Sequence, residues 1–143
     1  MSLHYYGDSK LVLLSTAIAL LAAALAWQLN RLLKNLPDRY LFFLAPFQEE
    51  AVKTFPAIYM GVSIFFIHVL FGAVEAVWEI FSCCRNGFFA GLAALASHSA
   101  FGFITASTYA LYDASLPAIF AGYLAHISWN YVVMLLATRR RKN

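Results

Sequence analysis

Charged residues are scarce in this chain. Lysine and arginine together number 10 and aspartate and glutamate 7, so that only 12% of the 143 residues are charged, whereas 62% are hydrophobic. A soluble domain of this size leaves roughly a third of its unfolded-chain surface exposed, and so few polar residues could not cover it. The composition excludes an ordinary soluble protein. It predicts an all-α polytopic transmembrane bundle that forms a single domain over residues 1–143.

The sequence also lacks cysteine pairs suited to an ordinary disulfide bond. Cys83 and Cys84 are its two cysteines and are adjacent. Normal bridge geometry needs a larger separation between the Cα atoms. We interpret both as free thiols near a helix end.

Basic residues lie beside the apolar segments rather than on a separate surface. They fall in two groups, Arg31 with Lys34 and Arg39, and the run Arg139 to Lys142. With five helices, both groups fall on the same side of the membrane, which is the arrangement that cytoplasmic loops favour. We therefore expect an integral protein of the cell membrane with its N-terminus outside and its C-terminus in the cytoplasm. The net charge of +3 does not indicate a nucleic-acid partner.

Five helices are predicted from the apolar segments. Residues 40–81 are too long for one span, because about 42 residues of helix would extend about 60 Å, twice the hydrocarbon thickness. We place the break at Pro56 and Gly61. The predicted helices cover residues 11–29, 40–55 or a little beyond, 58–81, 88–111 and 117–137, with the site-bearing core at about 40–137.

Ionisable and polar groups interrupt four of these apolar segments. They are Glu49 and Glu50, then Glu75, then His98, and finally His126 with Asn130. A lone carboxylate or imidazole at membrane depth costs at least a few kcal/mol. Counted from the basic side, their depths agree within roughly 6 Å at the helical rise per residue. We therefore expect these side chains to converge on one site between the helices.

The spacing of these groups favours acid–base chemistry. Lys53 lies four residues from Glu49 and three from Glu50, so it can pair with either carboxylate on one helix face. A poised carboxylate suits a general base, and an Asn amide can donate to a developing oxyanion. A buried Glu–Lys pair that only fixes helix packing is the structural alternative. We interpret His68 as a structural histidine and Glu79 as a solvated residue.

The order of these motifs resembles that of a known family. Glu49-Glu50-x-x-Lys53, Phe71-Gly72-x-x-Glu75, His98 followed by small residues, and His126-x-x-x-Asn130 occur in sequence between about residues 45 and 130. The pattern is similar to that of PrsW-type intramembrane proteases, within the CAAX-protease and bacteriocin-processing superfamily. The same superfamily extends distantly to a non-catalytic scaffold subunit of presenilin complexes.

The resemblance implies hydrolysis of peptide bonds in a membrane-associated protein or peptide. Glu49 or Glu50 would activate water, His98 and His126 would complete the site, and Asn130 would stabilise the oxyanion. Lys53, Phe71 and Glu75 would support them. Glu75, His98 and His126 would suit Zn²⁺ or another divalent metal with an open position for water, whereas a metal-free mechanism uses the same residues. A non-catalytic membrane scaffold or substrate-binding subunit is the alternative function.

Overall fold

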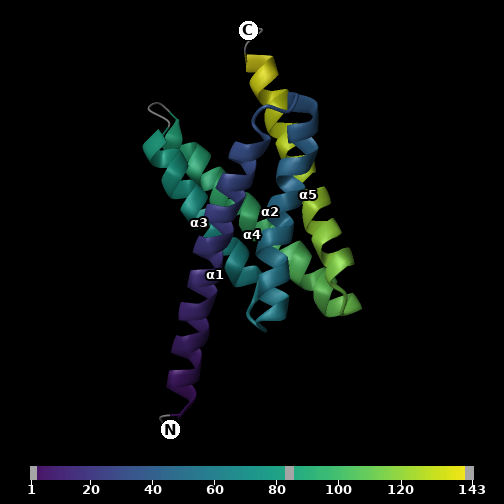
Figure 1. Cartoon of the computed structure of the whole chain (residues 1–143). Coiled ribbons are helices and arrows are strands. Elements are labelled where there is room, and N and C mark those ends of the chain that lie inside the picture. The colour runs from purple at the N-terminus through teal and green to yellow at the C-terminus, as the bar shows by residue number, and fades with distance from the viewer. Residues whose placement is uncertain (1–2, 83–85, 141–143) are drawn as a thin grey trace.

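The computed structural model describes residues 3–82 and 86–140 of the chain, so Cys83 and Cys84 lie outside the described residues. The described part consists of five α-helices without a strand, which confirms the predicted all-α, five-helix class (Figure 1). In chain order the helices are α1 (Leu3–Leu33), α2 (Asp38–Tyr59), α3 (Ile64–Ser82), α4 (Gly87–Tyr112) and α5 (Ser115–Arg140).

Four helices are long and apolar enough to cross a membrane. The qualifying segments are Ser9–Leu33, Ile64–Ser82, Gly87–Tyr112 and Ser115–Arg139. Helix α2 does not qualify, although it has 22 residues. It carries Glu49, Glu50 and Lys53 within five consecutive residues, and these charged side chains lower its mean hydropathy. The length and composition of the other four are those of an integral membrane protein in a lipid bilayer.

The boundary between α2 and α3 differs from the prediction. Pro56 lies inside α2, which continues to Tyr59, and α3 begins at Ile64 rather than at residue 58. Pro56 removes one backbone hydrogen bond of α2 but does not end the helix, which continues to Tyr59. The chain reverses at Gly61, whose φ of +65° favours glycine. Its N–H donates to the Ile58 carbonyl, and the N–H of Val62 donates to the Ala57 carbonyl, which is a Schellman C-cap.

The five helices form a closed ring. Helix α1 packs against α2 and α3, α4 packs between α3 and α5, and α5 returns to α2. Helix α2 also contacts α3, so it packs mainly against three neighbours, α1, α3 and α5. Consecutive helices run in opposite directions, with the two ends of the chain at opposite ends of the bundle (Figure 1).

Small residues allow α3 and α4 to approach closely. A Cβ atom on Gly72 would lie 2.8 Å from the Cβ of His98, and one on Gly102 would lie 2.5 Å from the Cβ of His68. Neither glycine could become alanine without moving a helix, because such separations are well inside van der Waals contact. The two glycines therefore bring the backbones that carry His68 and His98 together.

Candidate functional site

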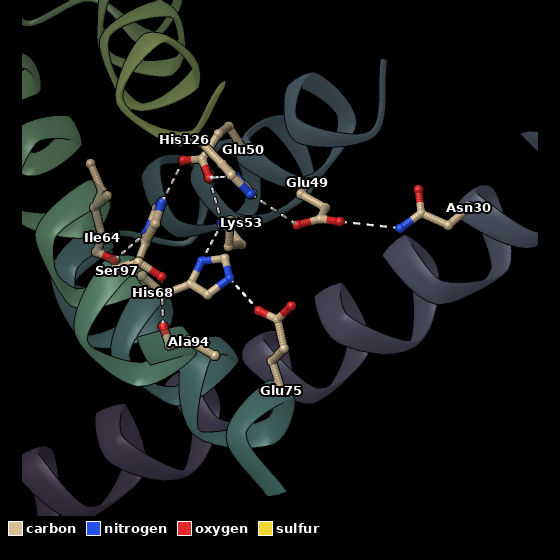
Figure 2. Close-up of polar contacts among 11 residues, drawn as sticks. Asn30, Glu49, Glu50, Lys53, Ile64, His68, Glu75, Ala94, Ser97 and His126 are labelled. Carbon is tan, nitrogen blue, oxygen red and sulfur yellow. Dashed lines mark hydrogen bonds and ion pairs between the residues drawn. The ribbon is translucent and has the colours of Figure 1, made fainter. Parts of the chain in front are cut away.

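Glu50 is the centre of a polar cluster buried inside the bundle. Its side chain has no exposed surface, and its Oε1 atom lies 2.5 Å from Lys53 Nζ and 3.0 Å from His126 Nδ1. Its Oε2 atom lies 3.0 Å from His68 Nε2 (Figure 2). Three nitrogen atoms from α2, α3 and α5 thus surround one carboxylate, and the donors among them compensate for its removal from water.

His68 is held in a fixed orientation toward Glu50. Its Nδ1 atom lies 2.9 Å from the carbonyl oxygen of Ile64, one helical turn earlier. A backbone carbonyl can only accept, so Nδ1 donates to it; Nε2 faces Oε2 of Glu50, and a hydrogen bond between these two atoms requires a proton on one of them. His68 is fully buried, as expected for a structural histidine, but its partner is the central acid of the cluster.

Lys53 connects the central carboxylate to α4. Its ammonium group donates to Nδ1 of His98 over 3.1 Å and lies 4.6 Å from the centre of the Phe71 ring. Because Nδ1 of His98 accepts, the ring proton is on Nε2, which donates to Oε2 of Glu75. A continuous chain of hydrogen bonds therefore runs from Glu50 through Lys53 and His98 to Glu75.

Glu49 is held on the other side of the cluster by α1. Asn30 donates from Nδ2 to Oε1 of Glu49 over 3.1 Å (Figure 2). Gln48 donates in turn to the Asn30 side-chain carbonyl. The remaining oxygen of Glu49, Oε2, faces Nε2 of His126 at 3.9 Å. This contact is too long for a direct hydrogen bond.

The gap between Glu49 and His126 has the hydrogen-bonding character that a water molecule requires. Since His126 Nδ1 donates to Glu50, a neutral ring leaves Nε2 as an acceptor. Oε2 of Glu49 is an acceptor as well, so a water between them would donate one hydrogen to each. The hydrogen-bonding pattern therefore suits a water molecule beside a carboxylate that is able to take its proton.

Aromatic rings and a glycine complete the walls of the cluster. Phe101 stacks on His126 with ring centres 4.8 Å apart and an interplanar angle of 21°, and it contacts His98 edge-on at 5.5 Å. Gly122 of α5 faces Glu50, and a Cβ atom there would lie 2.7 Å from Oε2. Because Gly122 has no side chain, the Glu50 carboxylate can approach α5 closely.

A cleft of about 630 Å³ borders this cluster between α1 and α3. Glu49 and Glu75 line it, and their side chains are 15% and 40% exposed, whereas Glu50 is not exposed. The other lining residues all come from α1 and α3. Glu49 is thus the carboxylate of the adjacent pair that an incoming molecule can reach.

Asn130 makes no hydrogen bond with the polar cluster among the described residues. It is one turn beyond His126 on α5 and is partly buried. Within the described part of the chain, no hydrogen bond joins its amide to another side chain either. Its expected role as an oxyanion donor remains a prediction.

Among residues 3–82 and 86–140, the group that could hold a metal ion is Glu49, His98 and His126, whose ligand atoms lie within 4.8 Å of one another. The sequence-based set had Glu75 in place of Glu49. In the structure Glu75 binds the ring of His98 instead. Both nitrogens of His98 already have partners, one of them the Lys53 ammonium. A metal would have to displace one of these partners and bring its ligands roughly 1 Å closer together.

The cluster combines residues from all five helices. The sequence-predicted Glu49, Glu50, Lys53, Phe71, Glu75, His98 and His126 lie together. The sequence did not indicate Asn30, Phe101 or Gly122 as parts of the site. Compared with known proteins, the chain matches no family model, no curated protein and no solved structure.

Proposed function

We propose that the protein is an intramembrane endopeptidase that hydrolyses peptide bonds of membrane-associated substrates with a water activated by Glu49. The observation that carries the proposal is the position of Glu49. It lies on the wall of the cleft, with one oxygen held by Asn30 and the other facing His126 across a gap that suits a water molecule.

In the proposed reaction, Glu49 removes a proton from this water as its oxygen attacks the carbonyl carbon of the substrate. The resulting tetrahedral intermediate carries a negative oxygen, for which we assign the Asn130 amide as a donor. Glu49 then returns the proton to the leaving amine, and the peptide bond breaks. His126 orients the water, because its Nδ1 is fixed by Glu50.

Glu50 has a different role from Glu49 in this proposal. Its carboxylate is fully buried and is occupied by Lys53, His68 and His126. It fixes the positions of Lys53 and His126 rather than contacting the substrate. Lys53 already supplies a cation next to Glu50 and His98, which favours a metal-free mechanism over one that needs Zn²⁺.

The test compares the wild-type protein with Glu49→Gln in lipid nanodiscs. Each is incubated with a solubilised membrane-protein fraction, and new amino termini are labelled and identified by mass spectrometry. We expect new termini with the wild type and none with Glu49→Gln at an unchanged thermal unfolding midpoint. Asp38→Asn is the matched control, because it makes the same chemical change at an exposed position of the same helix. Undiminished cleavage by Glu49→Gln would refute the assignment of the base.

A non-catalytic scaffold subunit is the second candidate. The fully buried Glu50, Lys53 and His68 favour it, since they connect α2 to α3 and α4 without facing the cleft. In that case the wild type would generate no new termini, and Glu49→Gln would lower the unfolding midpoint instead.

A further inference from the structure

The cleft beside Glu49 has an apolar part and an acidic part. Leu20, Ala23 and Ala24 of α1 line the apolar part. The carboxylates of Glu49, Glu75 and Glu79 and the amide of Asn30 line the acidic part, and Trp27 and Trp78 are also among the lining residues. Lysine and arginine are absent from the described residues that line it.

We propose that this cleft selects a transmembrane peptide segment with a lysine or arginine side chain beside the bond to be cut. The inference rests on the proposed peptidase function and names its substrate class. Clefts of about 300–1,000 Å³ enclose ligands of a few residues' size, and this one measures about 630 Å³. The apolar lining residues suit the hydrophobic part of such a segment, and the carboxylates suit its cation.

Charge complementarity supports a cationic occupant. Carboxylates beside an apolar wall attract a cation strongly, because little water screens them. Glu75 uses only Oε2 in the hydrogen bond with His98, and its side chain is 40% exposed. Its second oxygen is therefore accessible to a guanidinium or ammonium group from the cleft. An acidic or phosphate-bearing occupant would face repulsion from the same carboxylates.

The tryptophans add a second attraction for cations. Indole rings bind ammonium and guanidinium groups through their faces. The chain itself provides an example, because the guanidinium of Arg31 lies 5.6 Å from the centre of the Trp27 ring. Trp78 lines the same cleft about one helical turn from Glu75, and 62% of its surface is exposed. A substrate cation can thus contact a carboxylate and an indole face together.

Binding of matched peptides to the catalytically silent Glu49→Gln protein tests the inference. Three transmembrane peptides of about twenty residues are identical except for lysine, norleucine or glutamate about two turns from one end. Trp129→Phe removes the one tryptophan of the three outside the cleft lining, so that fluorescence reports Trp27 and Trp78. All measurements use phosphatidylcholine nanodiscs.

The lysine peptide should bind about tenfold more tightly than the norleucine peptide, and the glutamate peptide more weakly than either. Glu79→Gln should reduce the lysine preference, and Glu79→Lys should reverse it in favour of glutamate. Asp38→Asn, the matched exposed control, should leave the preference unchanged. Equal binding of the lysine and norleucine peptides would overturn the inference, as would an undiminished preference in Glu79→Gln.

The outcome is separable from that of the peptidase test. A lysine preference without any cleavage by the wild type would support the cationic cleft and refute the peptidase. Cleavage of the lysine and norleucine peptides at equal rates would support the peptidase and refute the cationic cleft.

Discussion

Replacement of Lys53 by methionine tests the buried ion pair that organises the site. Lys53→Met keeps most of the side-chain volume but removes the ammonium that lies 2.5 Å from Glu50 Oε1 and 3.1 Å from His98 Nδ1. Neither Lys53 nor Glu50 is exposed. Removal of one partner from a buried pair costs about 3–5 kcal/mol, because the other charge stays buried and uncompensated. We expect a destabilisation of that size.

The free energy of unfolding can be measured by titration with sodium dodecyl sulfate in mixed micelles, followed by near-ultraviolet circular dichroism. Lys34→Met is the matched control, because Lys34 is exposed between α1 and α2, and it should leave the free energy of unfolding unchanged.

A double-mutant cycle separates the pair from other effects. Glu50→Gln alone should also destabilise strongly, whereas Lys53→Met with Glu50→Gln should cost less than the sum of the single changes. A cost below about 1 kcal/mol for Lys53→Met, the range of exposed pairs, would refute the buried pair.

Three further outcomes are expected. Gly122→Ala should destabilise the protein by about 1–3 kcal/mol in the same titration, since its Cβ would lie 2.7 Å from Glu50 Oε2; an unchanged stability would contradict this packing. Asn30→Leu should lower kcat of peptide cleavage by about tenfold with little change in KM, because it releases Oε1 of Glu49; a change in KM alone would assign Asn30 to substrate binding. Chelation of divalent metals should leave the cleavage rate unchanged, and loss of activity that zinc restores would show that a metal displaces a partner of His98.

The helical class and the number of helices could be predicted from the sequence because apolar length and charge placement are local properties. The exact boundary between α2 and α3, which was placed near Pro56, could not be predicted from the sequence. Proline weakens a helix but ends it only when the following residues also stop it, and here Gly61 with the Schellman bonds provides the end. The predicted third helix therefore began six residues too early.

The convergence of acids and imidazoles was predictable because each of them is costly in an apolar segment. Which of the two adjacent acids faces the cleft and which is buried could not be predicted. Glu49 and Glu50 point in different directions from the helix, and only the packing of the neighbouring helices distinguishes those directions. Asn30 could not be predicted as a site residue either, because it lies at the polar end of an apolar segment, where an amide is common. The role of Gly122 could be recognised only from the structure, in which Glu50 of α2 lies against it.

The most direct test of hydrolysis by Glu49 is the fate of oxygen from isotopically labelled water. A transmembrane peptide that the wild type cleaves is incubated with each protein in labelled water, and the new carboxyl terminus is analysed by mass spectrometry. The wild type should place one labelled oxygen at that terminus, and Glu49→Gln should yield no such product. Labelled product from Glu49→Gln at the wild-type rate, or wild-type product without the label, would contradict the proposed reaction.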